Sequence, residues 1–205
     1  GTWIKGPGLS LFNHLKATLD PEGQGLPLIA EDLGLIDQPV IDLLESTKLP
    51  GMKVLQFAFD GDPNNAYLPH NFTSPHCIIY TGTHDNETTK GWWVSSAESI
   101  RHRVRKYCAA NGDAEQICWD MIRLAHASIA TLAIIPLQDL LALGNHARMN
   151  QPARIDPPAR IDPPSLSSGN WSWRVRHEAL NSDISERLRS IATLFGRCIK
   201  HDRKG

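Results

Sequence analysis

The sequence predicts an α/β fold built on a parallel β-sheet. Three short apolar runs do not alternate with polar residues and are bounded by Gly or Pro, which is typical of strands buried on both faces. Segments with helical spacing of apolar residues lie between these runs. Strands that alternate with helices are joined by crossovers, so the sheet should be parallel, either doubly wound or closed as a (β/α)8 barrel.

The predicted strands are short and unevenly supported. The three clear apolar runs are 26–30, 52–59 and 77–81. A fourth and weaker run, 131–136, follows a helical stretch directly, and a helix that continues until Pro136 is almost as good an interpretation.

The predicted helices are 37–48, 97–110 and 114–128. After them, residues 152–164 contain a tandem duplication of ARIDPP, whose paired prolines exclude helix and favour an extended surface loop. A last helix is predicted over 178–195, where apolar residues recur near helical spacing, and we expect it to pack on the rest of the chain.

Composition and charge exclude several classes of protein. The 205 residues are 41% hydrophobic and 21% charged, as in a globular chain. With 21 Lys and Arg against 22 Asp and Glu, the net charge of −1 gives no field to attract nucleic acid or a membrane surface, so we expect a neutral ligand. No apolar run approaches the roughly 20 residues of a membrane span. The four Cys lack zinc-ligand spacing, so we expect neither a disulfide framework nor a metal.

Acidic residues directly follow two of the predicted strands. Glu31 and Asp32 come after the first, and His84, Asp85 and Asn86 come after the third. In a parallel α/β fold the carboxyl ends of the strands carry the ligand site, so two carboxylates should face one crevice. Such a pair suits glycosidic chemistry, in which one carboxyl group protonates the departing oxygen and another stabilises positive charge on the sugar.

Each of these residues also has a structural interpretation. Asp32 or Asp85 could accept backbone N–H bonds as a helix N-cap. His84 alone could be a core histidine, but His, Asp and Asn together form a dense polar cluster that favours a site. Trp92 and Trp93 follow closely, and because adjacent side chains of a helix point apart, at most one of them can line a groove for sugar stacking.

Several long strings of the sequence recur, in order, in one enzyme family. The strings are IAEDLG at 29–34, PGMKVLQFAFDGDPNNAYLPHNF at 50–72, YTGTHDNETTKGWW at 80–93, and the shorter WIKGPG at 3–8, PLQDLL at 136–141, RMN at 148–150, GNWSWR at 169–174 and RLRSIATLFGR at 187–197. They resemble the amylomaltases, which are 4-alpha-glucanotransferases also called disproportionating enzymes. The resemblance covers nearly the whole chain.

The resemblance implies a fold, an activity and roles for individual residues. The family has a (β/α)8 barrel and transfers segments of alpha-1,4-glucan between maltodextrin acceptors by a retaining double displacement, without a metal or organic cofactor. By motif, Glu31 resembles the general acid/base, Asp85 resembles the carboxylate that stabilises the transition state, and His84 would bind hydroxyls of the same sugar. The positions that match residues near the donor subsites are Asn150, Asp32, Phe59 and His70.

Two departures from the family pattern bear on these expectations. The nucleophile of the family is an Asp in a segment like GRIDHFRG, which should precede WIKGPG and does not occur here. We regard the ARID strings at 153–156 and 159–162 as an accidental likeness because prolines follow them. In addition, the 18 residues of 151–168 separate RMN from GNW, where relatives use far fewer, so we expect Asn150 to be displaced.

The chain is therefore expected to be the carboxyl-terminal part of the enzyme, about strands five to eight of the barrel. Residues 1–150 would be the carboxyl half of the barrel, 151–168 an inserted Pro-rich loop, and 169–205 a terminal segment and helix. We expect poor solubility and no activity without the missing amino-terminal half, which would be the partner. The alternatives are a non-catalytic maltodextrin-binding fragment and an incomplete reading of a longer gene. We expect a cytoplasmic location, or a plastid if the missing end carried a transit peptide.

Overall fold

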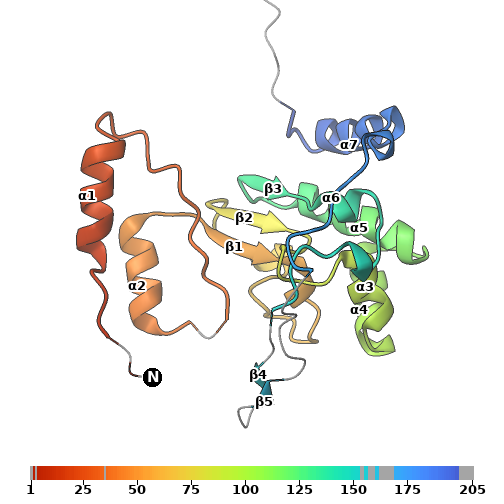
Figure 1. Cartoon of the computed structure of the whole chain (residues 1–205), viewed down its shortest axis with the longest axis horizontal. Helices are drawn as coiled ribbons and strands as arrows, with labels where there is room; N and C mark the ends of the chain where they lie inside the picture. Colours follow the sequence, from red (N-terminus) through yellow and green to blue (C-terminus); the bar gives the residue numbers. More distant parts are fainter. Residues whose placement is uncertain are drawn as a thin grey trace, which may run out of the picture.

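A three-stranded parallel sheet forms the centre of the computed structural model, which describes residues 2, 4–34, 36–152, 155–156, 160–161 and 169–198. The strands are β1 (Gly51–Val54), β2 (Cys77–Tyr80) and β3 (Leu132–Ile134), in that order across the sheet (Figure 1). Gly51 lies opposite Cys77, and Ile78 lies opposite Leu132. The predicted parallel α/β arrangement is confirmed.

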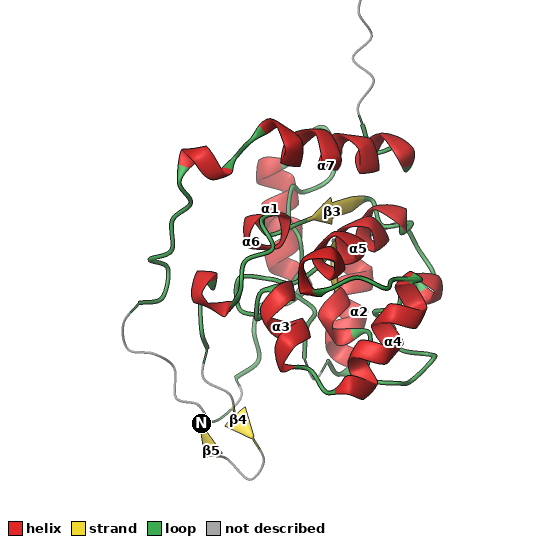
Figure 2. Cartoon of the chain, turned by 90° about the vertical axis from the view of Figure 1, so that its right-hand side faces the viewer, coloured by secondary structure: helices red, strands yellow, loops and turns green. Residues whose placement is uncertain are grey.

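The helices lie in separate groups around this sheet. Between β2 and β3 the chain forms α3 (Thr89–Ser95), α4 (Glu98–Cys108) and α5 (Ala114–Ala127), which cluster together in Figure 2. Before β1 it forms α1 (Leu9–Leu19) and α2 (Gln38–Thr47), which contact each other at the opposite side of the molecule in Figure 1. After β3 come the short α6 (Leu137–Leu140) and the terminal α7 (Ser182–Leu194).

Shorter elements connect these helices and strands. They are the 3-10 helices η1 (Leu55–Phe57), η2 (Pro69–Asn71), η3 (Asn145–Ala147) and η4 (His177–Ala179), and the two-residue strands β4 (Ile155–Asp156) and β5 (Arg160–Ile161), which pair antiparallel. These strands belong to the duplicated loop, and the rest of 153–168 lies outside the described residues. Among the described helices, none combines the length and apolar character that a membrane crossing requires.

The core lies between the sheet and α5. Ile117, Met121 and Ala125 recur every fourth residue on α5, so they share one face of that helix, and all three are fully buried. They belong to the same apolar cluster as Leu55 and Ile79, which are also fully buried. The carboxyl ends of the strands are thus supported from one side by a packed helix layer.

The start of α5 is fixed by an N-cap. The Asp113 carboxylate accepts hydrogen bonds from the backbone N–H groups of Glu115 and Gln116, both at 3.0 Å, and these bonds lower the pKa of Asp113. The stabilisation is therefore present above the unfolded-state pKa of an aspartate and is lost as pH falls through the lower folded-state value.

The terminal segment packs against the end of α5. The Arg197 guanidinium donates hydrogen bonds of 2.8 Å to the main-chain oxygens of His126 and Ser128 and one of 2.9 Å to that of Ala130. The Arg187 guanidinium lies 4.2 Å from the ring centre of Trp119 on α5. The predicted terminal helix is thus confirmed as α7, and it contacts the layer that supports the sheet.

Two of the strand predictions need correction. Residues 26–30 form no strand: Leu28 and Ile29 are 39% and 44% exposed, and the segment contacts β1 through the bond from Ala30 N–H to the Pro50 oxygen. An apolar run becomes a doubly buried strand only where neighbours cover both its faces, and the described residues supply none there. The run 52–59 is a strand only to Val54, after which η1 turns Leu55 into the core.

Candidate active site

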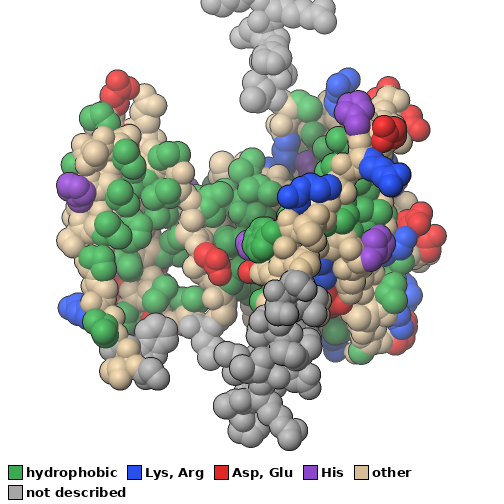
Figure 3. Space-filling model, viewed as in Figure 1, with side chains coloured by type: hydrophobic (Ala, Val, Ile, Leu, Met, Phe, Trp, Pro, Cys, Tyr) green, Lys and Arg blue, Asp and Glu red, His purple; other side chains and the backbone are tan. Residues whose placement is uncertain are grey.

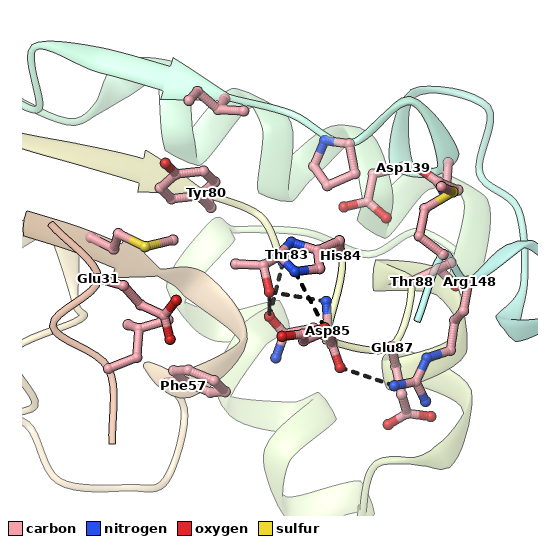
Figure 4. A pocket seen from close by; sticks show the side chains of 18 of the residues that line it. Glu31, Phe57, Tyr80, Thr83, His84, Asp85, Glu87, Thr88, Asp139 and Arg148 are labelled. Carbon is pink, nitrogen blue, oxygen red and sulfur yellow. Dashed lines mark hydrogen bonds and ion pairs between the residues drawn. The ribbon is translucent and has the colours of Figure 1, made fainter. Parts of the chain in front are cut away.

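A cavity of about 610 Å³ lies at the carboxyl ends of the three strands (Figure 4). Three of its walls follow the strands: Phe57 after β1, the loop 82–88 after β2, and 136–139 after β3. The segment around Glu31 and the pair Arg148 and Met149 complete the lining. The side chains that follow separate strands therefore meet in one space, as expected for a parallel sheet.

Glu31 points into this cavity, whereas Asp32 does not. The two residues flanking Glu31 both hydrogen-bond to the β1 region: Ala30 N–H donates to the Pro50 oxygen at 3.0 Å, and the Asp32 carboxylate accepts from Met52 N–H at 2.6 Å. Figure 4 shows the exposed Glu31 carboxyl group directed toward the open space. The predicted site residue Asp32 thus serves as a hydrogen-bond partner of the strand and lines a different hollow.

Asp85 lies across the cavity from Glu31 in a network of polar contacts (Figure 4). One carboxylate oxygen, Oδ1, accepts a hydrogen bond from Asn150 Nδ2 at 2.6 Å and lies 3.3 Å from His84 Nε2. The Asp85 main-chain oxygen accepts from Arg148 Nη2 at 3.0 Å. Asp85 and His84 have about half of their side-chain surface exposed, at 48% and 53%, so a ligand can reach both.

Asn150 is not displaced from this cluster, contrary to the expectation from the long 151–168 insertion. Besides the side-chain bond to Asp85, its backbone N–H donates to the His84 oxygen at 3.2 Å. The insertion therefore leaves the RMN segment beside the loop that carries Asp85.

The loop 82–88 owes its shape to its own sequence. Asn86 Oδ1 accepts from both the backbone N–H and the hydroxyl of Thr83, at 2.9 and 2.7 Å, which closes a tight turn around His84 and Asp85. Thr88 then caps α3 by accepting from Gly91 N–H at 3.1 Å. Short polar side chains at both places make the GTHDNETT string a turn that leads directly into a helix.

Trp171 brings a further segment of the chain beside His84. Its ring centre lies 5.1 Å from that of His84, and its backbone N–H donates to the Met149 oxygen at 2.5 Å. Trp171 has a φ of 63°, in the left-handed region that a bulky residue rarely adopts, and such strain is most common where function requires a fixed side chain. The aromatic ring therefore limits the positions available to His84.

Phe59 and His70, two other predicted site residues, lie elsewhere. Phe59 is only 4% exposed and packs against the rings of Trp92 and Tyr107 in the core. His70 Nδ1 lies 2.8 Å from the Tyr107 hydroxyl. Neither is among the residues that line the cavity, whereas Phe57, two positions before Phe59, is 40% exposed and lines it.

A second cavity of about 590 Å³ adjoins the first. Asp85, Glu87 and Arg148 line both, so the 85–87 part of the loop forms a wall between them. Trp92 lines the second cavity while Trp93 is buried at 5% exposure, as expected of adjacent residues in a helix. A ligand longer than one ring would have space on both sides of Asp85.

Within the described ranges, no three side chains of His, Cys, Asp or Glu come together in an arrangement that could bind a metal ion.

The hydrogen bond of Asp32 gives a first testable prediction. Replacing Asp32 with Ala should lower the free energy of unfolding by about 1–3 kcal/mol, because the partly buried Met52 N–H loses its carboxylate acceptor. Asp32→Asn keeps a side-chain oxygen and should cost less. Urea denaturation of the three proteins measures the difference, and equal losses for Ala and Asn would contradict this structural assignment.

The sequence is similar to one family of known enzymes. Residues 1–180 match the sequence model of a family described as 4-alpha-glucanotransferase. The chain is 43% identical over 203 residues to the 4-alpha-glucanotransferase of Synechocystis sp., covering 98% of this chain and 37% of that protein. It is 40% identical over 201 residues to the chloroplastic/amyloplastic 4-alpha-glucanotransferase of Arabidopsis thaliana, covering 96% of this chain and 32% of that protein.

A solved structure of the same family has a similar fold. The amylomaltase of Streptococcus agalactiae, determined in complex with acarbose, superposes with a TM-score of 0.83 at 34% identity, covering 97% of this chain and 37% of that one. The chain thus spans about a third of the length of the curated relatives that it matches.

Proposed function

The chain belongs to the 4-alpha-glucanotransferase family, and from this membership we propose that it contributes the acid/base side of a site that transfers segments of alpha-1,4-glucan. The observation that carries the proposal is that Glu31 and Asp85 face one cavity at the carboxyl ends of parallel strands (Figure 4). Two carboxyl groups in a shared space are the minimum that glycosidic chemistry requires.

In the proposed retaining reaction, Glu31 gives its proton to the glycosidic oxygen while a nucleophilic carboxylate bonds to the sugar carbon and displaces that oxygen. Glu31 then acts as a base and takes the proton of the acceptor hydroxyl, whose oxygen bonds to the sugar carbon and displaces the nucleophile. The Asp85 carboxylate stabilises the positive charge that develops on the sugar ring. His84 and Asn150 bind hydroxyl groups of that ring in this proposal, which their contacts with Asp85 support.

We propose that the nucleophile comes from a part of the polypeptide that corresponds to the remaining two thirds of the relatives, outside the region that this chain matches. A retaining site needs a further carboxylate about 5 Å from the acid/base, and the resemblance assigns it to a segment that this sequence does not contain. In support, no strand pairs with the outer edge of β1 or β3 within the described residues, and Leu132 on β3 is 47% exposed.

Exposed apolar surface supports the same arrangement. Hydrophobic side chains lie exposed across the side of the molecule that α1 and α2 form (Figure 3). Leu19 of α1 and Val40 of α2 are 62% and 43% exposed. We propose that 1–150 is part of a (β/α)8 barrel, about strands five to eight, that 151–168 is a loop inserted beside the glucan groove, and that 169–205 is a terminal segment packed on the barrel. The edges and apolar faces would then be covered by the remaining strands and helices.

Maltodextrins are the proposed substrates. The Streptococcus agalactiae relative was solved with the oligosaccharide analogue acarbose, and the two adjoining cavities here offer the aromatic rings of Phe57 and Trp92 beside carboxylate and amide groups. Because this sequence lacks the segment that carries the nucleophile in the family, one alternative function is favoured. In that alternative, the chain binds maltodextrin without turnover. Binding of acarbose without transfer, even in an assembled complex, would favour that alternative.

The experiment that tests the proposed function is complementation. The chain is co-expressed with the part of the Synechocystis sp. protein that lies outside the match, the complex is purified, and glucose release from maltotriose is measured. We expect transfer by the complex and none by either part alone. A complex that forms but releases no glucose would contradict the proposal, and the separate parts are the matched controls.

A further inference from the structure

The most deeply buried acidic side chain that faces the site has no assigned role. Asp139 lies three residues after Pro136, beyond the end of β3, and is only 1% exposed. Burial raises the pKa of its carboxyl group, while hydrogen bonds from Thr81 and Thr89 act in the opposite direction. Figure 4 shows Asp139 on the far side of the cavity from Glu31.

Its carboxylate accepts three hydrogen bonds, which use both oxygens. Oδ1 accepts from the backbone N–H of Thr89 at 2.7 Å. Oδ2 accepts from the Thr81 hydroxyl at 2.5 Å and from the Thr89 hydroxyl at 2.7 Å. A carboxylate is costly to bury unless such donors surround it, so these contacts account for its place in the interior.

The two donors lie at the two ends of the site loop. Thr81 directly follows the last residue of β2, and Thr89 is the first residue of α3. Between them runs the 82–88 loop with His84 and Asp85. Asp139 therefore connects both ends of that loop to the segment after β3, and the loop cannot shift as a unit without breaking hydrogen bonds of a buried charge.

The other contacts of the loop do not replace this connection. Thr83 and Asn86 bond to each other and fix only the internal shape of the turn. Gln56 Nε2 donates to the Glu87 oxygen at 2.9 Å from the β1 side, and Arg148 contacts the Asp85 oxygen from the outer side. Among these groups, only Asp139 bonds to the residues at both ends of the loop, Thr81 and Thr89.

We propose that Asp139 is a positioning residue that sets where the 82–88 loop presents Asp85 and His84 to the glucan. This inference rests on the proposed function for its effect on catalysis, but the placement of His84 can be measured without any turnover. A misplacement of the order of 1 Å in a catalytic group typically costs about a hundredfold in rate.

Two substitutions separate positioning from a chemical role of the charge. Asp139→Ala removes all three contacts. Asp139→Asn keeps them, because its oxygen can accept from Thr89 N–H and its amide group can donate to the two hydroxyls, which turn to accept. We expect Ala to disturb the loop and Asn to preserve it. If Asp139 acted through its charge or its proton, both variants would lose that function equally, because both lack the carboxyl group.

The first measurement is spectroscopic and uses the full chain. The ring protons of His84 sense the nearby Trp171 ring, so their NMR signals, assigned with His84→Asn, report the position of the loop. We expect the signals to move in Asp139→Ala and to stay in Asp139→Asn. Asp20→Ala is the matched control, since Asp20 is 9% exposed and accepts two backbone N–H bonds, from Gln24 and Gly25, far from this loop.

The second measurement is kinetic and uses the complemented complex with maltotriose. For Asp139→Ala we expect kcat to fall about ten- to a hundredfold with a smaller change in KM, while Asp139→Asn and Asp20→Ala stay within about threefold of the unchanged complex. If Asp139→Ala does not fold, Thr89→Val and Thr81→Val replace it, with Thr→Ser at the same positions as the conservative partners.

Either of two results would overturn the proposal: His84 signals that stay in place when Asp139 or its threonine partners are truncated, or an Asn variant as impaired as the Ala variant. A complex without any transfer activity would overturn the proposed function instead, and the NMR measurement would then decide on Asp139 by itself.

Discussion

Glu31→Gln is expected to reduce glucose release from maltotriose by about a hundredfold or more in the complemented complex, because the amide cannot donate a proton to the departing oxygen. The substitution keeps the size of the side chain, and Glu31 lies exposed at the cavity wall, so folding and complex formation should not change. Initial rates of glucose release at several maltotriose concentrations give the change in kcat and in KM separately.

The matched control for this variant is Glu22→Gln, an exposed acid in the loop after α1 whose carboxylate accepts a bond from Gln24. It should leave the rate unchanged. If Glu31→Gln kept a rate within a few-fold of the unchanged complex, Glu31 would not be the acid/base.

Asp85→Asn is expected to have a comparable or larger effect, about 10²- to 10³-fold on kcat, the range found when one group that stabilises transition-state charge is removed. Asn keeps an oxygen that can accept from Asn150 Nδ2, so the local network should persist while the negative charge is lost. The loss should therefore appear mainly in kcat and less in KM.

Asp42→Asn is the control for the second variant, since Asp42 is an exposed acid on α2 that bonds to Gln38 within its own helix. Retention of near-normal kcat by Asp85→Asn would show that the carboxylate does not act on the transition state. A loss confined to KM would instead indicate that Asp85 serves substrate binding alone.

The sequence predicted those parts of the fold that depend on local pattern. The strand at 77–81 and the helices at 37–48, 97–110, 114–128 and 178–195 agree with the structure within a few residues, because doubly buried or amphipathic patterns determine them. The weaker prediction at 131–136 also corresponds to a strand, β3, although no residue of β3 is fully buried. Helix α1 was not predicted, although Phe12, Leu15 and Leu19 recur at helical spacing, and none of its residues is buried in the structure. The strand predicted at 26–30 was wrong because its apolar residues lack the neighbours that would cover them in a sheet.

The site could be predicted at the level of segments but not of every side chain. Glu31, His84 and Asp85 line one cavity, and Asn150 donates a hydrogen bond to Asp85. His84 and Asp85 follow the parallel strand β2, whereas the segment before Glu31 forms no strand and is hydrogen-bonded beside β1. The sequence analysis named Phe59, whereas the structure places Phe57 at the cavity, because η1 ends with Phe57 exposed and Phe59 packs into the core after it.

Residues from distant segments were missed for a different reason. Arg148, Asp139 and Trp171 reach the site only through tertiary contacts, although each lies within a string that resembles the family. An acidic residue in such a string, a few residues after a predicted strand that ends at Pro136, is a signal that could have marked Asp139. For Trp171 the only local sign is Gly169, whose positive φ accompanies the strained turn.

The proposed function requires that Glu31 and Asp85 act on the same glucan ring. A crystal structure of the complemented complex with a bound maltodextrin tests it most directly. We expect one sugar ring in contact with Asp85 and the adjoining glycosidic oxygen within about 2.6–3.2 Å of the Glu31 carboxyl group. A saccharide bound elsewhere, for example in the groove between α5 and α7 that Trp119 and Trp173 line, with Glu31 and Asp85 both free of it, would contradict the claim.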